Sequence, residues 1–120
     1  MIRPDGPTSS IAAVVDAVET LDQKTVAYLH DVIEKGEGWT RAKLEELGFG
    51  PKIASAVQAM SRRDGEEYFS FIRRAASNPL ALPVKRADLQ DNVWQSRQIG
   101  QSPARYEAGL RMLDEEFSER

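Results

Sequence analysis

The sequence from residue 22 to residue 35, DQKTVAYLHDVIEK, predicts an α-helix with one apolar face. Its inner stripe is made of residues that recur at i, i+3, i+4 and i+7, namely Val26, Leu29, His30 and Ile33. The only histidine of the chain therefore lies on the apolar side of this helix. By spacing alone, such a histidine is most often a hydrogen-bonded member of the core.

The rest of the chain shows the same helical spacing of apolar residues. A first helix is predicted over residues 11–21, and Asp22 is the expected N-cap of the second. Further helices are predicted over residues 40–47, 51–60, 66–76, 84–93 and 103–118. Val93 and Trp94 are expected to end the sixth helix and close the core, with residues 95–101 as a polar connection. No strand-like alternation extends beyond about four residues.

The composition is that of an ordinary globular domain. The chain has 120 residues, of which 41% are hydrophobic and 29% charged, so it can bury a core without cross-links. We therefore expect an all-α fold, a compact bundle of about six to seven helices that forms one domain over residues 1–120. Because the chain has no cysteine, any metal would need oxygen and imidazole ligands.

Composition and charge also narrow the classes of partner. Residues 1–10 contain no apolar segment and no long apolar run follows, so we expect a cytoplasmic protein without a membrane span. The net charge of -3 and the pI near 5.2 argue against nucleic-acid binding. The pairs Arg62-Arg63 and Arg73-Arg74 are either a local basic patch or solvated charges on helix ends and faces.

Polar side chains that suit a metal site occur on two distant predicted helices. His30, Asp31 and Glu34 lie within about one turn of the second helix, and Asp88 and Asn92 are spaced i and i+4 on the sixth. If these helices pack side by side, an imidazole, carboxylates and an amide converge, a set suited to Mn, Fe, Co or Zn. The opposing interpretation is a core histidine with ordinary surface carboxylates.

Several motifs resemble the HD metal-dependent phosphohydrolases, particularly the RelA/SpoT branch that hydrolyses guanosine tetraphosphate and pentaphosphate. The resemblance covers residues 11–93 and rests on five segments in the order and spacing of that family. These segments are VAYLHDVIE (26–34), TRAKLEELG (40–48), IASAVQAMSRRD (53–64), GEEYFSFI (65–72) and NPLALPVKRADLQDN (78–92). It implies an HD-domain-like helical bundle and a nucleotide or related phosphate ester as the small-molecule substrate.

The resemblance also implies a role for each polar residue. His30, Asp31 and Asp88 match the metal ligands, and Glu34 matches the helix carboxylate implicated in hydrolysis. Asn92 matches the residue that closes the site on the substrate side. By resemblance the divalent metal is Mn, whereas a degenerate site would hold none.

Two departures from the family pattern bear on activity. The family has a further metal-binding histidine upstream, but the corresponding stretch here has Ser9 or Ser10, and the helices that normally precede it are missing. Asp5 is the nearest carboxylate that can substitute. Lys35 replaces an acidic residue, and it either pairs with neighbouring carboxylates or contacts a substrate phosphate.

Three hypotheses follow. The first is a metal-dependent phosphohydrolase with weakened activity. Loss of an outer-shell partner of a metal site lowers affinity or activity by about 10 to 100 fold, and loss of a ligating imidazole should lower it at least as much. The second is a non-catalytic remnant that binds a nucleotide or a protein, with a homodimer formed through the first or last helix. The third is a longer natural protein whose start lies upstream and includes the missing histidine.

Overall fold

The computed structural model describes residues 11–35 and 40–117, without the side chains of residues 11, 12, 34 and 35. The described part is all-helical, with seven helices and no strand, which confirms the predicted all-α bundle. The helices are α1 (Ile11–Ala17), α2 (Leu21–Lys35), α3 (Arg41–Glu46), α4 (Gly50–Ala59), α5 (Tyr68–Ala76), α6 (Ala81–Gln98) and α7 (Ala104–Glu116). None of these helices is long and apolar enough to cross a membrane.

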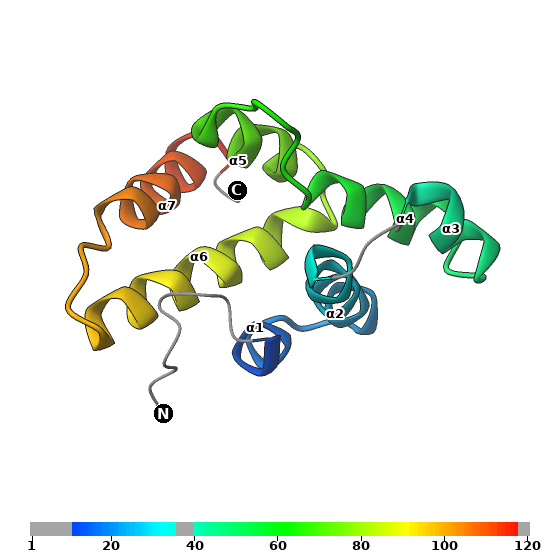
Figure 1. Ribbon diagram of the computed structural model, residues 1–120, viewed down its shortest axis with the longest axis horizontal. Coiled ribbons are helices and arrows are strands. Elements are labelled where there is room, and N and C mark those ends of the chain that lie inside the picture. The colour runs from blue at the N-terminus through cyan, green and yellow to red at the C-terminus, as the bar shows by residue number, and fades with distance from the viewer. Residues whose placement is uncertain (1–10, 36–39, 118–120) are drawn as a thin grey trace.

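The long helix α6 organises the molecule. It packs against α7 and α5 on one side and against α1 and α2 on the other, and it also contacts α4 (Figure 1). The short helices α3 and α4 extend the bundle at one end (Figure 1). The Cα radius of gyration is 14.0 Å, close to the about 13.6 Å typical of a compact chain of this length.

Two apolar clusters lie on either side of α6. The larger one joins α1, α2 and α4 to Val84 and Ala87 of α6, and the smaller one joins α5 and α7 to Leu89. Because Val84 and Leu89 lie on different faces of the helix, the residues on the face between them are also covered. These covered residues are polar, among them Lys85 and Asp88.

The start of α2 corrects a prediction about the first two helices. Leu21 begins α2 and is 79% exposed, so it does not belong to the apolar stripe of the first helix. The N-cap is Thr20 rather than Asp22, because the Thr20 hydroxyl accepts a hydrogen bond from the Gln23 backbone N–H at 3.1 Å. The Gln23 side chain accepts from the Thr20 N–H in return, at 3.4 Å, which completes a capping box.

The end of α6 also differs from the prediction. The helix continues through Gln95 and Ser96, which are 2% and 1% exposed, so the expected polar connection begins only after Gln98. Trp94 is 45% exposed and does not close the core. Helix α6 stops at Gly100, whose φ of 73° permits the two backbone bonds of a Schellman motif. The prediction was wrong because large apolar residues were taken as the stop signal.

Candidate functional site

Helices α2 and α6, the two segments that carry the candidate site, pack against each other, which was the condition for their polar side chains to converge. His30 on α2 is 7% exposed and Asp88 on α6 is 5% exposed. Asn92, one turn after Asp88, is half-buried, and so is Asp31. The two helices therefore bury an imidazole and a carboxylate within one bundle, where both groups are shielded from bulk water.

Asp88 has a cationic partner that the sequence analysis did not single out. The Lys85 ammonium donates to Asp88 Oδ2 at 3.3 Å, and the two side chains are 5% and 7% exposed. The same ammonium lies 4.3 Å from the centroid of the Phe71 ring on α5, at cation–π distance. The i, i+3 spacing of Lys85 and Asp88 was a signal for this pair, but it does not show that the pair is buried.

The second oxygen of Asp88 has no donor among the described residues. Its Oδ1 atom is buried without a hydrogen bond. Two further atoms of the same helix, Gln95 Oε1 and Ser96 Oγ, are also buried without a hydrogen-bond partner among the described residues. Leaving a buried acceptor unpaired costs about 1–3 kcal/mol, and more for a charged group. Oδ1 is therefore the atom of this helix with most to gain from a cation or a donor on a ligand.

The donor types fit a divalent ion, because a buried carboxylate oxygen and an imidazole are common ligands of Mn, Fe, Co and Zn. Within residues 11–35 and 40–117, however, no three side chains of His, Cys, Asp or Glu come together as a metal-holding group. The side chains of Glu34 and Lys35, together with Asp5, Ser9 and Ser10, lie outside the described part. The predicted roles of these residues stay predictions.

No family model matches the chain, and no curated protein matches it. The resemblance to HD phosphohydrolases therefore remains an inference from the sequence motifs. The chemistry of the site has to be argued from the described side chains themselves.

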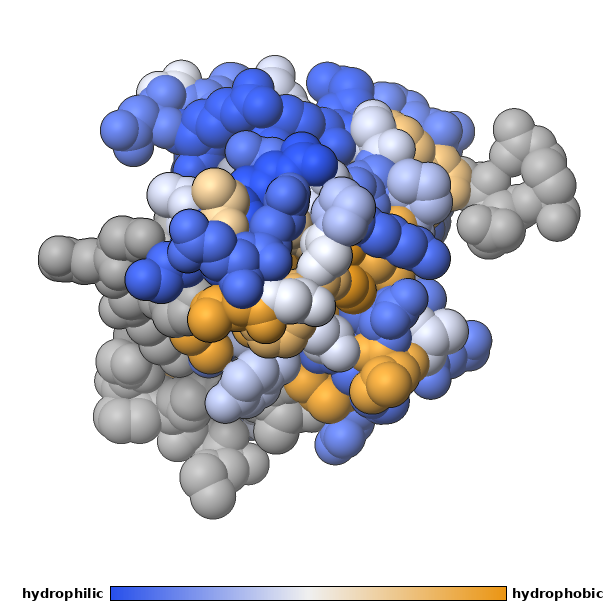
Figure 2. Space-filling view, turned by 90° about the vertical axis from the view of Figure 1, so that its right-hand side faces the viewer, coloured by the Kyte–Doolittle hydropathy of each residue, from blue (hydrophilic) through white to orange (hydrophobic). Residues whose placement is uncertain are grey.

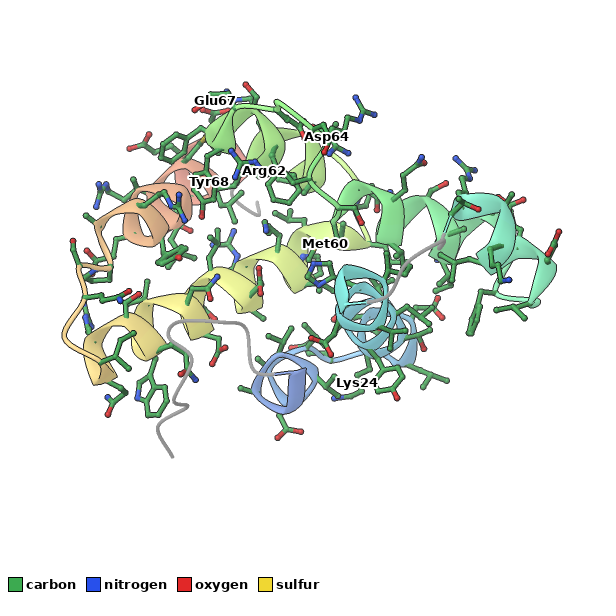
Figure 3. The ribbon with its side chains drawn as sticks, viewed as in Figure 1. Lys24, Met60, Arg62, Asp64, Glu67 and Tyr68 are labelled. Carbon is green, nitrogen blue, oxygen red and sulfur yellow. The ribbon has the colours of Figure 1, made fainter. Side chains whose placement is uncertain are left out.

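A second polar group, missed in the sequence, lies on α5 and packs against the smaller apolar cluster, which includes Leu89 of α6. Tyr68 begins α5, and Figure 3 shows its side chain beside that of Arg62. Burial raises the pKa of Tyr68 to about 12, the Arg105 charge opposes the rise, and the charges of Tyr106 and Asp88 add to it. No local sequence pattern reveals the surroundings of Tyr68, because the residues that form them come from α5, α6, α7 and a loop.

The predicted basic pairs divide between two roles. Arg73 is paired with Glu116 at 2.9 Å on the surface, as a solvated charge of a helix face would be, whereas Arg74 is paired with Glu66 at 2.8 Å in a largely buried ion pair. Arg62 instead lies against the Tyr68 ring at 5.7 Å from its centroid.

Proposed function

We propose that the chain is an HD-type phosphohydrolase-like protein that acts on a nucleotide or related phosphate ester, with guanosine polyphosphates as the first substrates to try. The observation that carries the proposal is Asp88, a buried carboxylate with an unpaired oxygen on a helix packed against the His30 helix. A buried carboxylate oxygen without a protein donor is available to a cation, to a donor on a ligand or to water.

In this proposal His30, Asp31 and Asp88 would hold a divalent ion, with Mn preferred by resemblance. These three side chains do not form a metal-holding group as they stand, so they would have to move together to bind the ion. Such an ion supplies a nucleophile near neutral pH by lowering the pKa of a bound water. By resemblance, Glu34 would take the proton of that water, and Asn92 and Lys35 would contact the substrate. The Asp88 and His30 side chains are buried, so they would meet the substrate away from bulk water.

Two features argue for weak rather than full activity. The chain has a single histidine, so at most one imidazole can bind the ion. The Lys85 ammonium already neutralises part of the Asp88 charge at 3.3 Å and competes with a metal for it. Both features lower the affinity for the ion, and an ion that is bound only part of the time lowers the turnover.

The test uses protein purified without chelator. We expect bound transition metal by elemental analysis, a rise in melting temperature on adding Mn, and slow release of pyrophosphate from guanosine tetraphosphate. Asp88→Asn should abolish the rise, whereas Asp22→Asn, which changes an exposed carboxylate of α2, should keep it. Absence of both bound metal and a Mn effect in the unaltered protein would overturn the proposal.

A second candidate is a non-catalytic module that binds a nucleotide or a protein on the same scaffold. The Lys85–Asp88 pair favours it, because an internal ammonium can balance the carboxylate without any metal. In this case a nucleotide binds, but neither EDTA nor Mn changes its affinity. Titration of guanosine tetraphosphate by calorimetry, with EDTA and then with Mn, separates the two candidates.

The predicted homodimer needs apolar surface, and Figure 2 shows separate apolar patches on the side of the molecule that carries α3. The large exposed apolar side chains of the described part are Leu21, Tyr28, Leu47, Phe49 and Trp94. None of them lies on α1 or α7, the helices that the sequence analysis proposed for the interface. Light scattering at micromolar concentration tests the dimer, and a strict monomer would contradict it.

A further inference from the structure

We propose that Arg62, Tyr68 and Arg105 form a subsite that binds a phosphate group. The inference rests on the proposed function and adds to it, since it names where a second phosphate of the substrate is held. The ligand class is a diphosphate or a phosphate ester that carries more than one phosphate.

The first argument is the convergence of two guanidinium groups on one ring. The Arg105 Cζ atom lies 4.4 Å from the centroid of Tyr68, and the Arg62 Cζ atom lies 5.7 Å from it. Arg105 belongs to α7, whereas Arg62 belongs to the connection between α4 and α5 (Figure 3). Two cations from separate elements therefore share one aromatic neighbour.

The second argument is that both groups keep N–H donors for a ligand. A guanidinium that stacks on a ring uses its face, and its five N–H groups point outward in the plane. Arg62 uses Nε and Nη2 for the Glu66 carbonyl at 3.0 and 2.9 Å. Arg105 donates from Nη2 to the Tyr106 hydroxyl at 3.4 Å. The remaining donors suit the oxygens of a phosphate, which guanidinium groups bind in a bidentate way.

The third argument is the balance of charge. Five other arginines of the described part are held by carboxylates, in the pairs Arg41–Glu45, Arg73–Glu116, Arg74–Glu66, Arg86–Asp114 and Arg97–Glu107. Arg62 and Arg105 contact only neutral oxygens and rings among the residues that the structure describes. Arg63 and Arg111 likewise have no carboxylate partner among the described residues, but only Arg62 and Arg105 converge on one ring, so this pair is the best placed to hold an anionic ligand.

The Tyr68 hydroxyl supplies a third donor. Its ring is half-buried, and with a pKa of about 12 it stays protonated throughout the physiological range. Tyr68 packs against the apolar cluster that includes Leu89, the residue after Asp88, so an anion held at Tyr68 would lie in the same part of the molecule as the candidate hydrolytic centre. Repulsion from Asp88 is then balanced by the two guanidinium groups.

The test is calorimetric titration of inorganic pyrophosphate in the presence of EDTA, which removes any contribution of a metal. We expect Arg105→Gln to weaken binding by at least about tenfold, since a charged hydrogen bond is lost. Arg111→Gln is the matched control, because Arg111 is an exposed arginine on the same helix. This variant should bind pyrophosphate with the same affinity as the unaltered protein. Tyr68→Phe should weaken binding a few fold while keeping the ring.

The subsite is overturned if Arg105→Gln and Arg62→Gln bind pyrophosphate as tightly as Arg111→Gln. If Arg105→Gln proves unfolded by circular dichroism, Tyr68→Phe decides, and unchanged affinity in that variant overturns the inference. Asp88→Asn should bind pyrophosphate at least as well as the unaltered protein, since it removes a repulsive charge. If Mn effects and hydrolysis are absent but Arg105-dependent binding persists, the proposed hydrolysis fails and the subsite stands.

Discussion

Lys85 and Asp88 form an ion pair almost entirely shielded from water. Their side chains are 5% and 7% exposed, and the Phe71 ring covers the ammonium. Transferring two such groups from water into the interior is costly, and only their mutual attraction offsets the cost. Each charge therefore depends on the other, and removing one leaves the second buried without compensation.

We expect Lys85→Met to lower the free energy of unfolding by about 3 kcal/mol, the lower end of the range for a broken buried pair. Urea denaturation followed by circular dichroism measures the loss. The double variant Lys85→Met with Asp88→Asn should be less destabilised than the sum of its single changes, because no charge is left unpaired.

The control is Lys52, whose ammonium lies 3.7 Å from Asp22 at the surface, with side chains 75% and 53% exposed. Lys52→Met should change the free energy of unfolding by less than about 1 kcal/mol, as is usual for exposed pairs. Equal losses in Lys85→Met and Lys52→Met would show that burial of the α6 pair adds nothing to its strength.

Arg74 is the residue of α5 that holds the connection between α4 and α5. Arg74 on α5 donates to both carboxylate oxygens of Glu66, at 2.8 and 2.9 Å, and to the Ser61 carbonyl at 2.7 Å. The Glu66 carboxylate also accepts from the Arg63 backbone N–H at 3.0 Å. These bonds fix the start of α5, and with it Tyr68, relative to the end of α4.

This connection makes stability depend on pH in a defined window. The Arg74 guanidinium and the Arg63 N–H lower the pKa of Glu66 from 4.5 to about 2. A lowered pKa means that the stabilisation is present above pH 4.5 and is lost as pH falls toward 2. We expect the melting temperature to fall between pH 4.5 and 2, and Glu66→Gln to show a smaller fall in that window.

Glu115→Gln, an exposed change on α7, is the control for this pH series. Its profile should follow that of the unaltered protein. A Glu66→Gln profile parallel to both would contradict the assignment of acid sensitivity to the Glu66–Arg74 pair.

Helix α7 approaches its neighbours closely at one glycine. A Cβ atom at Gly109 would lie 3.0 Å from Ile72 Cδ1 on α5 and 3.3 Å from Leu89 Cδ1 on α6. At Gly109, α7 packs directly on the smaller apolar cluster, which joins α5, α6 and α7. The position of α7, and of Arg105 upon it, thus depends on a residue without a side chain.

We expect Gly109→Leu to lower the free energy of unfolding by about 2 kcal/mol, because extra atoms in a packed contact force neighbours apart. Ala104→Leu adds the same side chain at an exposed position of α7 and should stay within about 0.5 kcal/mol. Urea denaturation compares the two variants. Equal stability of Gly109→Leu and the unaltered protein would contradict close packing of α7.

The helices themselves were largely predictable, because their signals are local. The inner stripe of α2 agrees with the sequence analysis. Residues 40–47 anticipate α3 to within one residue at each end, and residues 103–118 anticipate α7 to within two. The errors, at Leu21 and Trp94, arose where an apolar residue was assumed to be buried. Burial is not a property of one residue, so local patterns mislead most at such positions.

The amino-acid order alone indicated an all-helical chain and named His30 and Asp88 as polar residues of interest on two helices. Only the packing of the helices decided that Asp88 is buried with Lys85, with one oxygen left unpaired. Packing also decided that Arg62 and Arg105 meet at Tyr68. The physical reason is that helix formation depends on neighbours within a few turns, whereas burial, ion pairing and ring contacts depend on segments that meet only when the chain is folded.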